Sequence, residues 1–261
     1  MECHRNPHLG KTLVQAAKHA DRHGVPPISY STAKSYLNNL SALFKWAVRE
    51  EYAHRNPFEQ LAVPGTPTKK KDRKDPFAVD QLVAIFNAPL FTGCRDDGPG
   101  YAQPGPNTPR RGRFWVPLLS LWTGMRLNEC CQLDVGDIKT IDGTDCIVIR
   151  ETDDQGDDDD DKRVKSASGE RFVPVHPELK RIGFMIYVGE MRERNSRKLF
   201  PELKVGQDGY YSSPFSKWFK RFCIKAGAKA DKTSFHSFRH NYRDALREAE
   251  IGIERVRALG G

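Results

Sequence analysis

Three residues are spaced so that they could act together on one phosphate. Arg126 follows a Thr-Gly turn, and His236 and Arg239 lie three residues apart, which would place them on one face of a helix. An arginine guanidinium keeps its charge and can donate two hydrogen bonds to a single phosphate. A histidine can exchange a proton close to neutral pH. Such a set could stabilise the negative charge that develops on phosphate oxygens during a transfer reaction.

The stretches around these residues resemble two motifs of one protein family. Thr123-Gly124-Met125-Arg126, followed by Glu129, is similar to a Thr-Gly-x-Arg turn. About 110 residues later, His236-Ser237-Phe238-Arg239 is similar to a His-x-x-Arg box. Both are motifs of the phage-integrase family, the tyrosine site-specific recombinases. Either motif alone is common in unrelated proteins, so their order along one chain is what favours the family.

Two further segments extend the resemblance. Lys165 precedes the stretch Phe172-Val173-Pro174-Val175-His176-Pro177, which is similar to the hairpin that holds the family's catalytic lysine. Lys45-Trp46-Ala47-Val48, followed by Asn56-Pro57, resembles the end of the family's helical core-binding domain. The likeness therefore extends from about residue 12 to the last residue.

The resemblance implies a role for each of four residues. Arg126 and Arg239 would hold the scissile phosphate, and His236 would act as the acid–base group. Lys165 would give a proton to the leaving 5′ oxygen; the alternatives are that it is a solvated loop lysine or that Lys162, three residues earlier, stands in its place. A 3′-phosphotyrosine intermediate would conserve the energy of the broken bond. No metal and no other cofactor is therefore expected.

Partners and location also follow from the resemblance. It implies double-stranded DNA as the substrate and a tetramer on DNA in the full-length protein. A bacterial or phage-encoded protein of the cytoplasm, associated with the nucleoid, is expected. No run of eighteen apolar residues and no signal peptide is found in the sequence, so no association with a membrane is expected.

The C-terminal end departs from the family pattern. The family has a second His or Trp about two dozen residues after the Arg of His-x-x-Arg, and a nucleophilic Tyr beyond it. This sequence ends at Ala258-Leu259-Gly260-Gly261, and Tyr242 is its only tyrosine after Arg239. We therefore expect the chain to be truncated before its nucleophile, clipped at its N-terminal domain, and inactive in cleavage. The alternatives are a non-catalytic DNA-binding remnant of an integrase, or an unrelated helical protein.

Composition and charge agree with a polyanionic partner. The 261 residues carry a formal net charge of +8, although seven aspartates gather between positions 153 and 161. Outside that acidic run, which is expected to be a solvated loop tip, the chain is more basic still. A basic surface favours nucleic acid. The six cysteines are scattered without metal-ligand spacing, so no metal site is expected.

The N-terminal part is predicted to be a helical core-binding domain over residues 1–63. A helix should begin at Ser31 or Thr32, either of which could cap it. Its polar face carries Lys34, Asn38 and Lys45, which lie either in solvent or against DNA phosphates. Residues 64–76 contain prolines, a glycine and five basic side chains, which predicts an extended linker. Its basic residues are Lys69, Lys70, Lys71, Arg73 and Lys74; they either follow the DNA backbone or serve a merely soluble spacer.

Residues 77–261 are predicted to form the integrase-type catalytic domain. The hydrophobic pattern predicts a helix over 79–86, a long loop over 93–113, and a buried helix over 114–132 that is interrupted at Thr123-Gly124. Strands at 146–149 and 171–175 should form a hairpin. Further helices are predicted over 177–192, 213–226 and 234–248. The fold class is therefore mainly α with a small antiparallel β-sheet, an α+β fold.

Overall fold

The structure divides into two units. The computed structural model describes residues 12–26, 28–65, 74–149, 171–252, 254–255 and 259. Contacts within the chain separate Met1–Arg73 from Lys74–Gly261, here called the N-terminal and C-terminal units. The last residues of the expected linker go with the C-terminal unit. Lys74 Nζ donates to the carbonyl oxygen of Asp231 at 2.9 Å, and the Asp75 amide donates to that of Lys232 at 3.0 Å.

The N-terminal unit contains two described helices, α1 (Leu13–Arg22) and α2 (Tyr30–Arg49). Ser29, rather than Ser31 or Thr32, caps α2, because its Oγ accepts the Thr32 amide at 3.1 Å. Ser29 is the N-cap because this residue lies one position before the first helical residue, from where its side chain can reach the free backbone amides of the first turn.

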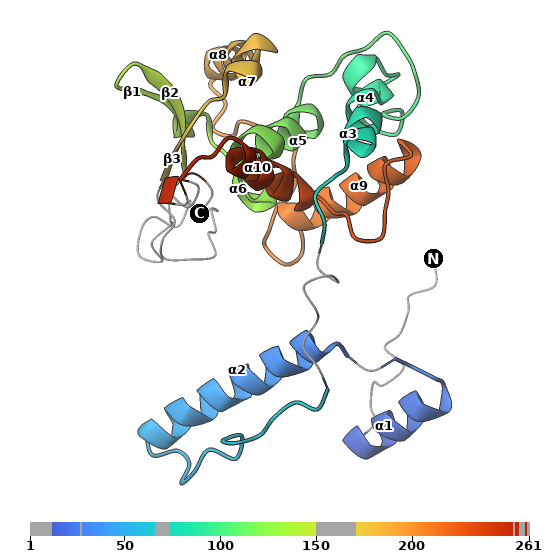
Figure 1. Ribbon diagram of the computed structural model, residues 1–261, viewed down its shortest axis with the longest axis vertical. Coiled ribbons are helices and arrows are strands. Elements are labelled where there is room, and N and C mark those ends of the chain that lie inside the picture. The colour runs from blue at the N-terminus through green and yellow to red at the C-terminus, as the bar shows by residue number, and fades with distance from the viewer. Residues whose placement is uncertain are drawn as a thin grey trace. The chain divides into compact units, whose positions relative to one another are not determined.

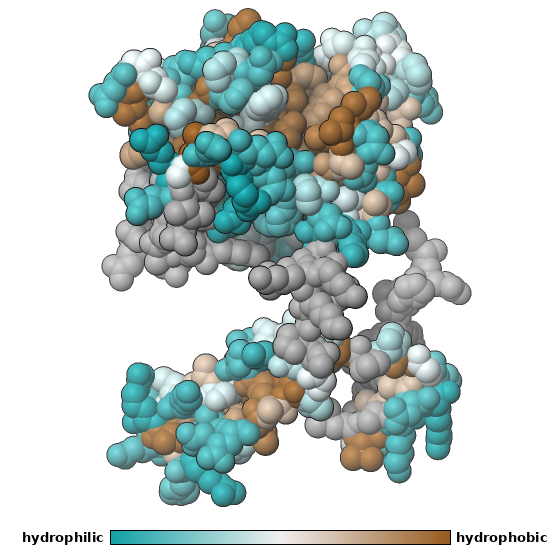
Figure 2. Space-filling model, in the orientation of Figure 1, coloured by the Kyte–Doolittle hydropathy of each residue, from teal (hydrophilic) through white to brown (hydrophobic). Residues whose placement is uncertain are grey.

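One face of α2 is covered by the chain that follows it. Asn56 Nδ2 donates to Ser41 Oγ at 3.0 Å, and the rings of Phe44 and Phe58 lie 5.2 Å apart. Even so, no residue of α2 is buried. Its large exposed apolar side chains are Tyr36, Leu40, Leu43, Trp46 and Val48. Figure 2 shows apolar surface on this unit among its hydrophilic surface.

The C-terminal unit is mainly helical (Figure 1). Its described helices are α3 (Val79–Phe86), α4 (Pro89–Thr92), α5 (Gly112–Thr123), α6 (Leu127–Cys131), the 3-10 turn η2 (Val135–Asp137), α7 (Pro177–Arg181), α8 (Phe184–Glu193), α9 (Ser212–Lys225) and α10 (Ser237–Glu248). The predicted interruption at Thr123-Gly124 is confirmed. The helix predicted over 177–192 is instead two helices, because Gly183 adopts φ +97° between them.

A three-stranded antiparallel sheet has the order β1 (Ile138–Ile141), β2 (Thr144–Ile149), β3 (Arg171–Pro174). Ile147 pairs with Ile138 on one side and Val173 on the other. The pairing of β2 with β3 confirms the predicted hairpin, whereas β1 was not predicted. The sequence feature that could have predicted β1 is Asp142-Gly143, which forms a two-residue turn with φ +48° and +76° and favours a tight hairpin.

The long loop before α5 is held by its own polar groups. Asp96 Oδ1 accepts the amides of Gly98 and Gly100, each at 2.8 Å. Arg111 Nε donates to Asp97 Oδ2 at 2.7 Å. The bonds to Asp96 satisfy backbone amides that no helix or strand pairs, and the bond between Arg111 and Asp97 ties the loop to the residue that precedes α5.

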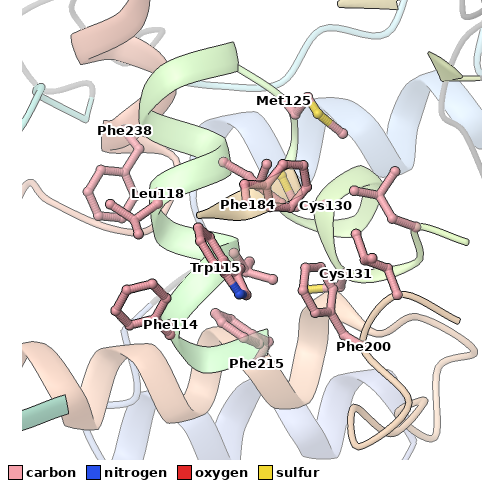
Figure 3. Packing of buried hydrophobic residues seen from close by; sticks show 14 of the residues in the cluster. Phe114, Trp115, Leu118, Met125, Cys130, Cys131, Phe184, Phe200, Phe215 and Phe238 are labelled. Atoms are coloured by element: carbon pink, nitrogen blue, oxygen red, sulfur yellow. The ribbon is translucent and has the colours of Figure 1, made fainter. Parts of the chain in front are cut away.

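The core of the C-terminal unit surrounds α5. Most of this helix is buried, and the Trp115 side chain is fully enclosed. Figure 3 shows Trp115 among the side chains of Phe114, Phe184, Phe200 and Phe215. A helix that is apolar on nearly all sides must be covered by neighbours. One of these is α10, which packs beside α5 (Figure 1). This packing brings the end of α5 to the start of α10.

Candidate active site

The turn between α5 and α6 fixes the position of Arg126. Gly124 ends α5 with φ +66° and ψ 11°, in the left-handed region that favours glycine. Thr123 Oγ1 donates to the Leu119 carbonyl at 2.5 Å, and Ser120 Oγ donates to the Met125 carbonyl at 3.1 Å. Because these hydroxyls are buried, the turn is held from inside the domain.

Tyr242 of α10 packs directly on this turn. A Cβ atom added to Gly124 would lie 2.8 Å from Tyr242 Cε1 and closer still to Cδ1. Burial raises the pKa of the Tyr242 phenol, and the charge of Arg171 opposes that rise in part. Tyr242 therefore acts as a packing residue on the face of α10.

Glu129 anchors Arg126 on the other side of the turn. The Arg126 amide donates to Glu129 Oε2 at 2.8 Å, and Arg126 Nη1 donates to Oε1 at 2.9 Å. The Glu129 side chain is 3% exposed, whereas that of Arg126 is 32% exposed. One edge of the Arg126 guanidinium is thus fixed while another part of it meets solvent.

Arg239 reaches the same turn from α10. Its side chain is buried, and Nη1 donates to the Gly124 carbonyl oxygen at 2.6 Å. Burial, and then the charge of Arg126, lower the pKa of Arg239 to about 10, which leaves it positively charged at neutral pH. Two guanidinium groups therefore lie close enough for their charges to repel.

His236 is exposed and lies immediately before α10. Partial desolvation lowers the pKa of His236, and the nearby positive or titratable side chains lower it further. These are His240, Arg239, Arg126 and Arg243. A histidine with a lowered pKa is mainly neutral at pH 7, so it can accept a proton.

The structure brings together three of the predicted site residues, namely Arg126, His236 and Arg239. Lys165 lies outside the described residues, and so do Lys69, Lys70, Lys71 and Arg73. Lys34, Asn38 and Lys45 are exposed on α2, and Lys74 is exposed on the C-terminal unit.

Two features of the C-terminal unit were not predicted. Arg171 is buried at the start of β3 and donates from Nη2 to Glu129 Oε2 at 2.7 Å. A lone arginine at a strand end gave no signal in the sequence. The second feature is a cavity of about 580 Å³ lined in part by Lys74, Lys217, Lys220 and Lys229. None of these lysines forms an ion pair with a described carboxylate. Lys217 and Lys220 stand three apart on α9, a spacing that could have indicated a basic helix face.

Within the described ranges, no group of three or more His, Cys, Asp or Glu side chains could hold a metal ion. None of the described helices is long and apolar enough to cross a membrane.

A family comparison decides the class of this fold and site. The model of the phage integrase family matches residues 113–261, more than half of the chain, and the match includes Arg126, His236 and Arg239. The chain belongs to the phage integrase family. Members of this family are tyrosine recombinases, and the mainly α fold of this chain with a small antiparallel sheet agrees with that family.

Curated relatives match this chain over part of their length. Tyrosine recombinase XerD from two strains of Staphylococcus epidermidis is 29% and 28% identical over 108 residues. That alignment covers 41% of this chain and 31% of each relative. The matched part thus spans about a third of the curated relatives.

Solved structures match more of this chain at lower identity. The Tn1549 transposon integrase in complex with circular intermediate DNA covers 97% of this chain and 78% of its own, with a TM-score of 0.55 and 18% identity. XerH recombinase bound to difH substrate covers 94% and 62%, with a TM-score of 0.55 and 18% identity. A lambda integrase dimer bound to a core site has a TM-score of 0.51 at 16% identity, covering 94% and 85%. These likenesses show the fold.

Proposed function

We propose that this integrase binds duplex DNA and holds a scissile phosphate at Arg126, His236 and Arg239 for site-specific strand exchange. The observation that supports the proposal is the proximity of the three side chains, because Arg239 bonds to the turn that carries Arg126 and the charges of both arginines lower the pKa of His236. Arg239 is bonded to the carbonyl of Gly124, two residues before Arg126. Fixed cations placed where phosphate charge develops lower the barrier to transesterification.

The three residues would have different roles. Arg126 and Arg239 would stabilise the non-bridging oxygens of the phosphate, because neither loses its charge at working pH. His236, mainly neutral, would accept a proton from an attacking hydroxyl and return it later. Lys165 is proposed to protonate the leaving 5′ oxygen, on the family resemblance of the sequence around it.

The covalent step is proposed from the family as well. It would form a 3′-phosphotyrosine, so that a tyrosine oxygen replaces the 5′ oxygen on phosphorus and a proton goes to the leaving oxygen. Tyr242 is a poor candidate for the nucleophile, because its ring packs on Gly124. The nucleophile would then come from outside the 261 residues of this sequence. The alternative is a DNA-binding integrase without cleavage, which the packing of Tyr242 also permits.

DNA contacts are proposed on both units. The N-terminal contacts would be Lys34, Asn38 and Lys45, and the linker contacts Lys69, Lys70, Lys71, Arg73 and Lys74. On the C-terminal unit, Lys217 and Lys220 join this set, because they line the cavity in which four lysines gather. The full-length protein is proposed to act as a tetramer on DNA in the bacterial nucleoid.

A binding experiment tests the proposal. Gel-shift titrations with a duplex of arbitrary sequence at two salt concentrations should show binding that weakens steeply with salt, because DNA releases counterions. Arg126→Ala should weaken binding, whereas Arg181→Ala, which removes an exposed arginine paired with Glu178, should have little effect. Undetectable binding of the wild-type chain at low salt would refute the nucleic-acid function.

A further inference from the structure

A buried carboxylate beside the site is shared by two arginines. Glu129, in the first turn of α6, receives Arg126 from one side and Arg171 from the start of β3 on the other. Burial alone would raise the pKa of Glu129, but the hydrogen bonds and charges of Arg171 and Arg126 outweigh it and lower the pKa. The carboxylate is therefore ionised and holds both guanidinium groups.

Arg171 uses its whole guanidinium inside the domain. Nη2 donates to Glu129 Oε2 at 2.7 Å and Nη1 to Oε1 at 3.4 Å, so the pair is bidentate. Nε donates to the carbonyl oxygen of Leu259 at 3.3 Å. The side chain is only 6% exposed. Arg171 is thus fixed in all directions and has no surface to offer to a DNA phosphate.

Arg126 makes the complementary, incomplete contact. Only Nη1 of its side chain bonds to Glu129, at 2.9 Å, and no other described residue accepts a hydrogen bond from the guanidinium. With a third of the side chain exposed, its remaining N–H groups can meet a ligand. An arginine in this state combines a fixed position with unused donors.

The two contacts depend on each other through the carboxylate. A carboxylate and a guanidinium prefer the bidentate arrangement, and Arg171 occupies that arrangement on Glu129. If Arg171 were absent, Arg126 could take both oxygens, since Glu129 would then be its sole partner. Two guanidinium groups on one carboxylate also leave a net positive charge beside the site, whereas one would leave a neutral pair.

We propose that Arg171 is a positioning residue that reserves Arg126 for the phosphate, by occupying the bidentate edge of Glu129 and keeping the cluster positively charged. This inference rests on the proposed function for its biological meaning. In physical terms, Arg171 determines how the N–H donors of Arg126 are divided between Glu129 and a ligand.

The titration of His236 reports on Arg126 without any DNA. The charge of Arg126 is one of the largest causes of the lowered pKa of His236, and the charge of Arg171 is not one of these largest causes. In Arg171→Met, Arg126 should pair fully with Glu129, so we expect the pKa of His236 to rise. The measurement is an NMR titration of histidine ring carbons, with the His236 signal assigned from His236→Gln. Arg181→Met, which breaks an exposed arginine–glutamate pair, is the matched control and should leave the pKa of His236 unchanged.

A second variant separates positioning from simple loss of stability. Glu129→Gln combined with Arg171→Met removes the carboxylate as well, so Arg126 has no anion to pair with and the pKa of His236 should not rise. Arg171→Lys keeps the positive charge but cannot make the bidentate contact of a guanidinium, so the pKa of His236 should rise less than in Arg171→Met. If Arg171→Met does not fold, this lysine variant and the double variant decide the question. An unchanged His236 pKa in folded Arg171→Lys or Arg171→Met overturns the proposal.

The DNA experiment distinguishes the inference from the proposed function. Arg171→Met should bind duplex DNA with a salt dependence smaller by about one phosphate contact, although Arg171 is buried. A wild-type chain that fails to bind DNA refutes the proposed function, but the histidine titration still tests the role of Arg171. A wild-type chain that binds, with no change of the His236 pKa in the variants, refutes the role of Arg171 alone.

Discussion

Replacing Gly124 with alanine should test how firmly the site turn is built. The change has two separate costs. Gly124 has φ +66°, and an L-residue in this left-handed conformation costs about 1–2 kcal/mol. The new Cβ would also lie 2.8 Å from Tyr242 Cε1 and closer to Cδ1. Relief of such overpacking typically costs about 1–3 kcal/mol. Gly124→Ala should therefore lower the free energy of unfolding of the C-terminal unit by about 2–5 kcal/mol.

Two other glycines separate these costs. Gly143, in the turn between β1 and β2, has φ +76° but nothing within 4 Å of a Cβ. Gly143→Ala should therefore lose only the conformational part, about 1–2 kcal/mol. Gly189, inside α8, has neither problem, and its replacement by alanine should stabilise the helix by about 0.5–1 kcal/mol.

Urea unfolding of the intact chain, followed by circular dichroism, measures these differences as shifts of the midpoint. In thermal unfolding, a change of 1 kcal/mol in the free energy of unfolding corresponds to a shift of about 2–4 °C in Tm for a domain of this size. In a Tyr242→Ala background the contact is gone, so the cost of Gly124→Ala should fall to that of Gly143→Ala. Equal costs for Gly124→Ala and Gly143→Ala in the wild-type background would refute the reasoning that Tyr242 closes on the turn.

Three further predictions concern DNA and pH. Replacing Lys217 and Lys220 together by alanine should reduce the slope of DNA affinity against salt by about two contacts, measured by gel shift; an unchanged slope would remove the basic cavity from the DNA interface. A nicked suicide substrate should trap no covalent adduct with this chain, and an adduct that disappears with Tyr242→Phe would show that the nucleophile had been misplaced. Because the folded-state pKa of His236 is lowered, the unfolded state binds its proton more readily, so stability should fall as pH drops through about 6.5 and level off below the folded pKa. His236→Gln should flatten this dependence in urea titrations, and an unaltered slope would contradict it.

The site residues were within reach of the sequence because they lie in short motifs. Gly124 predicts a helix end, and Arg126 follows it closely. His236 and Arg239 are near each other in any helix that begins there, although the helix begins at Ser237 and not at 234. The spacing within each motif is local, so backbone geometry alone determines it.

Contacts between distant segments could not be predicted in this way. Arg171 and Glu129 are 42 residues apart, and their pairing depends on how β3 packs against α6. The lysines of the cavity come from the linker end, α9 and the turn before α10, which only the folded chain gathers. The helix break at Gly183 was not predicted, because a glycine within an apolar stretch is compatible with a continuous helix unless its φ is known.

These long-range contacts explain why the site can keep unused donors. Arg239 fixes the Gly124 carbonyl, Tyr242 covers the same glycine, and Arg171 of β3 holds Glu129 of α6. Each contact is made by a group at least partly buried, so the turn is determined from three directions by atoms that a ligand does not touch. A guanidinium that is positioned in this way needs no second acceptor of its own, because its neighbours hold the backbone that carries it. The exposed part of Arg126 is then free to bind an anion without the reorganisation that would weaken catalysis.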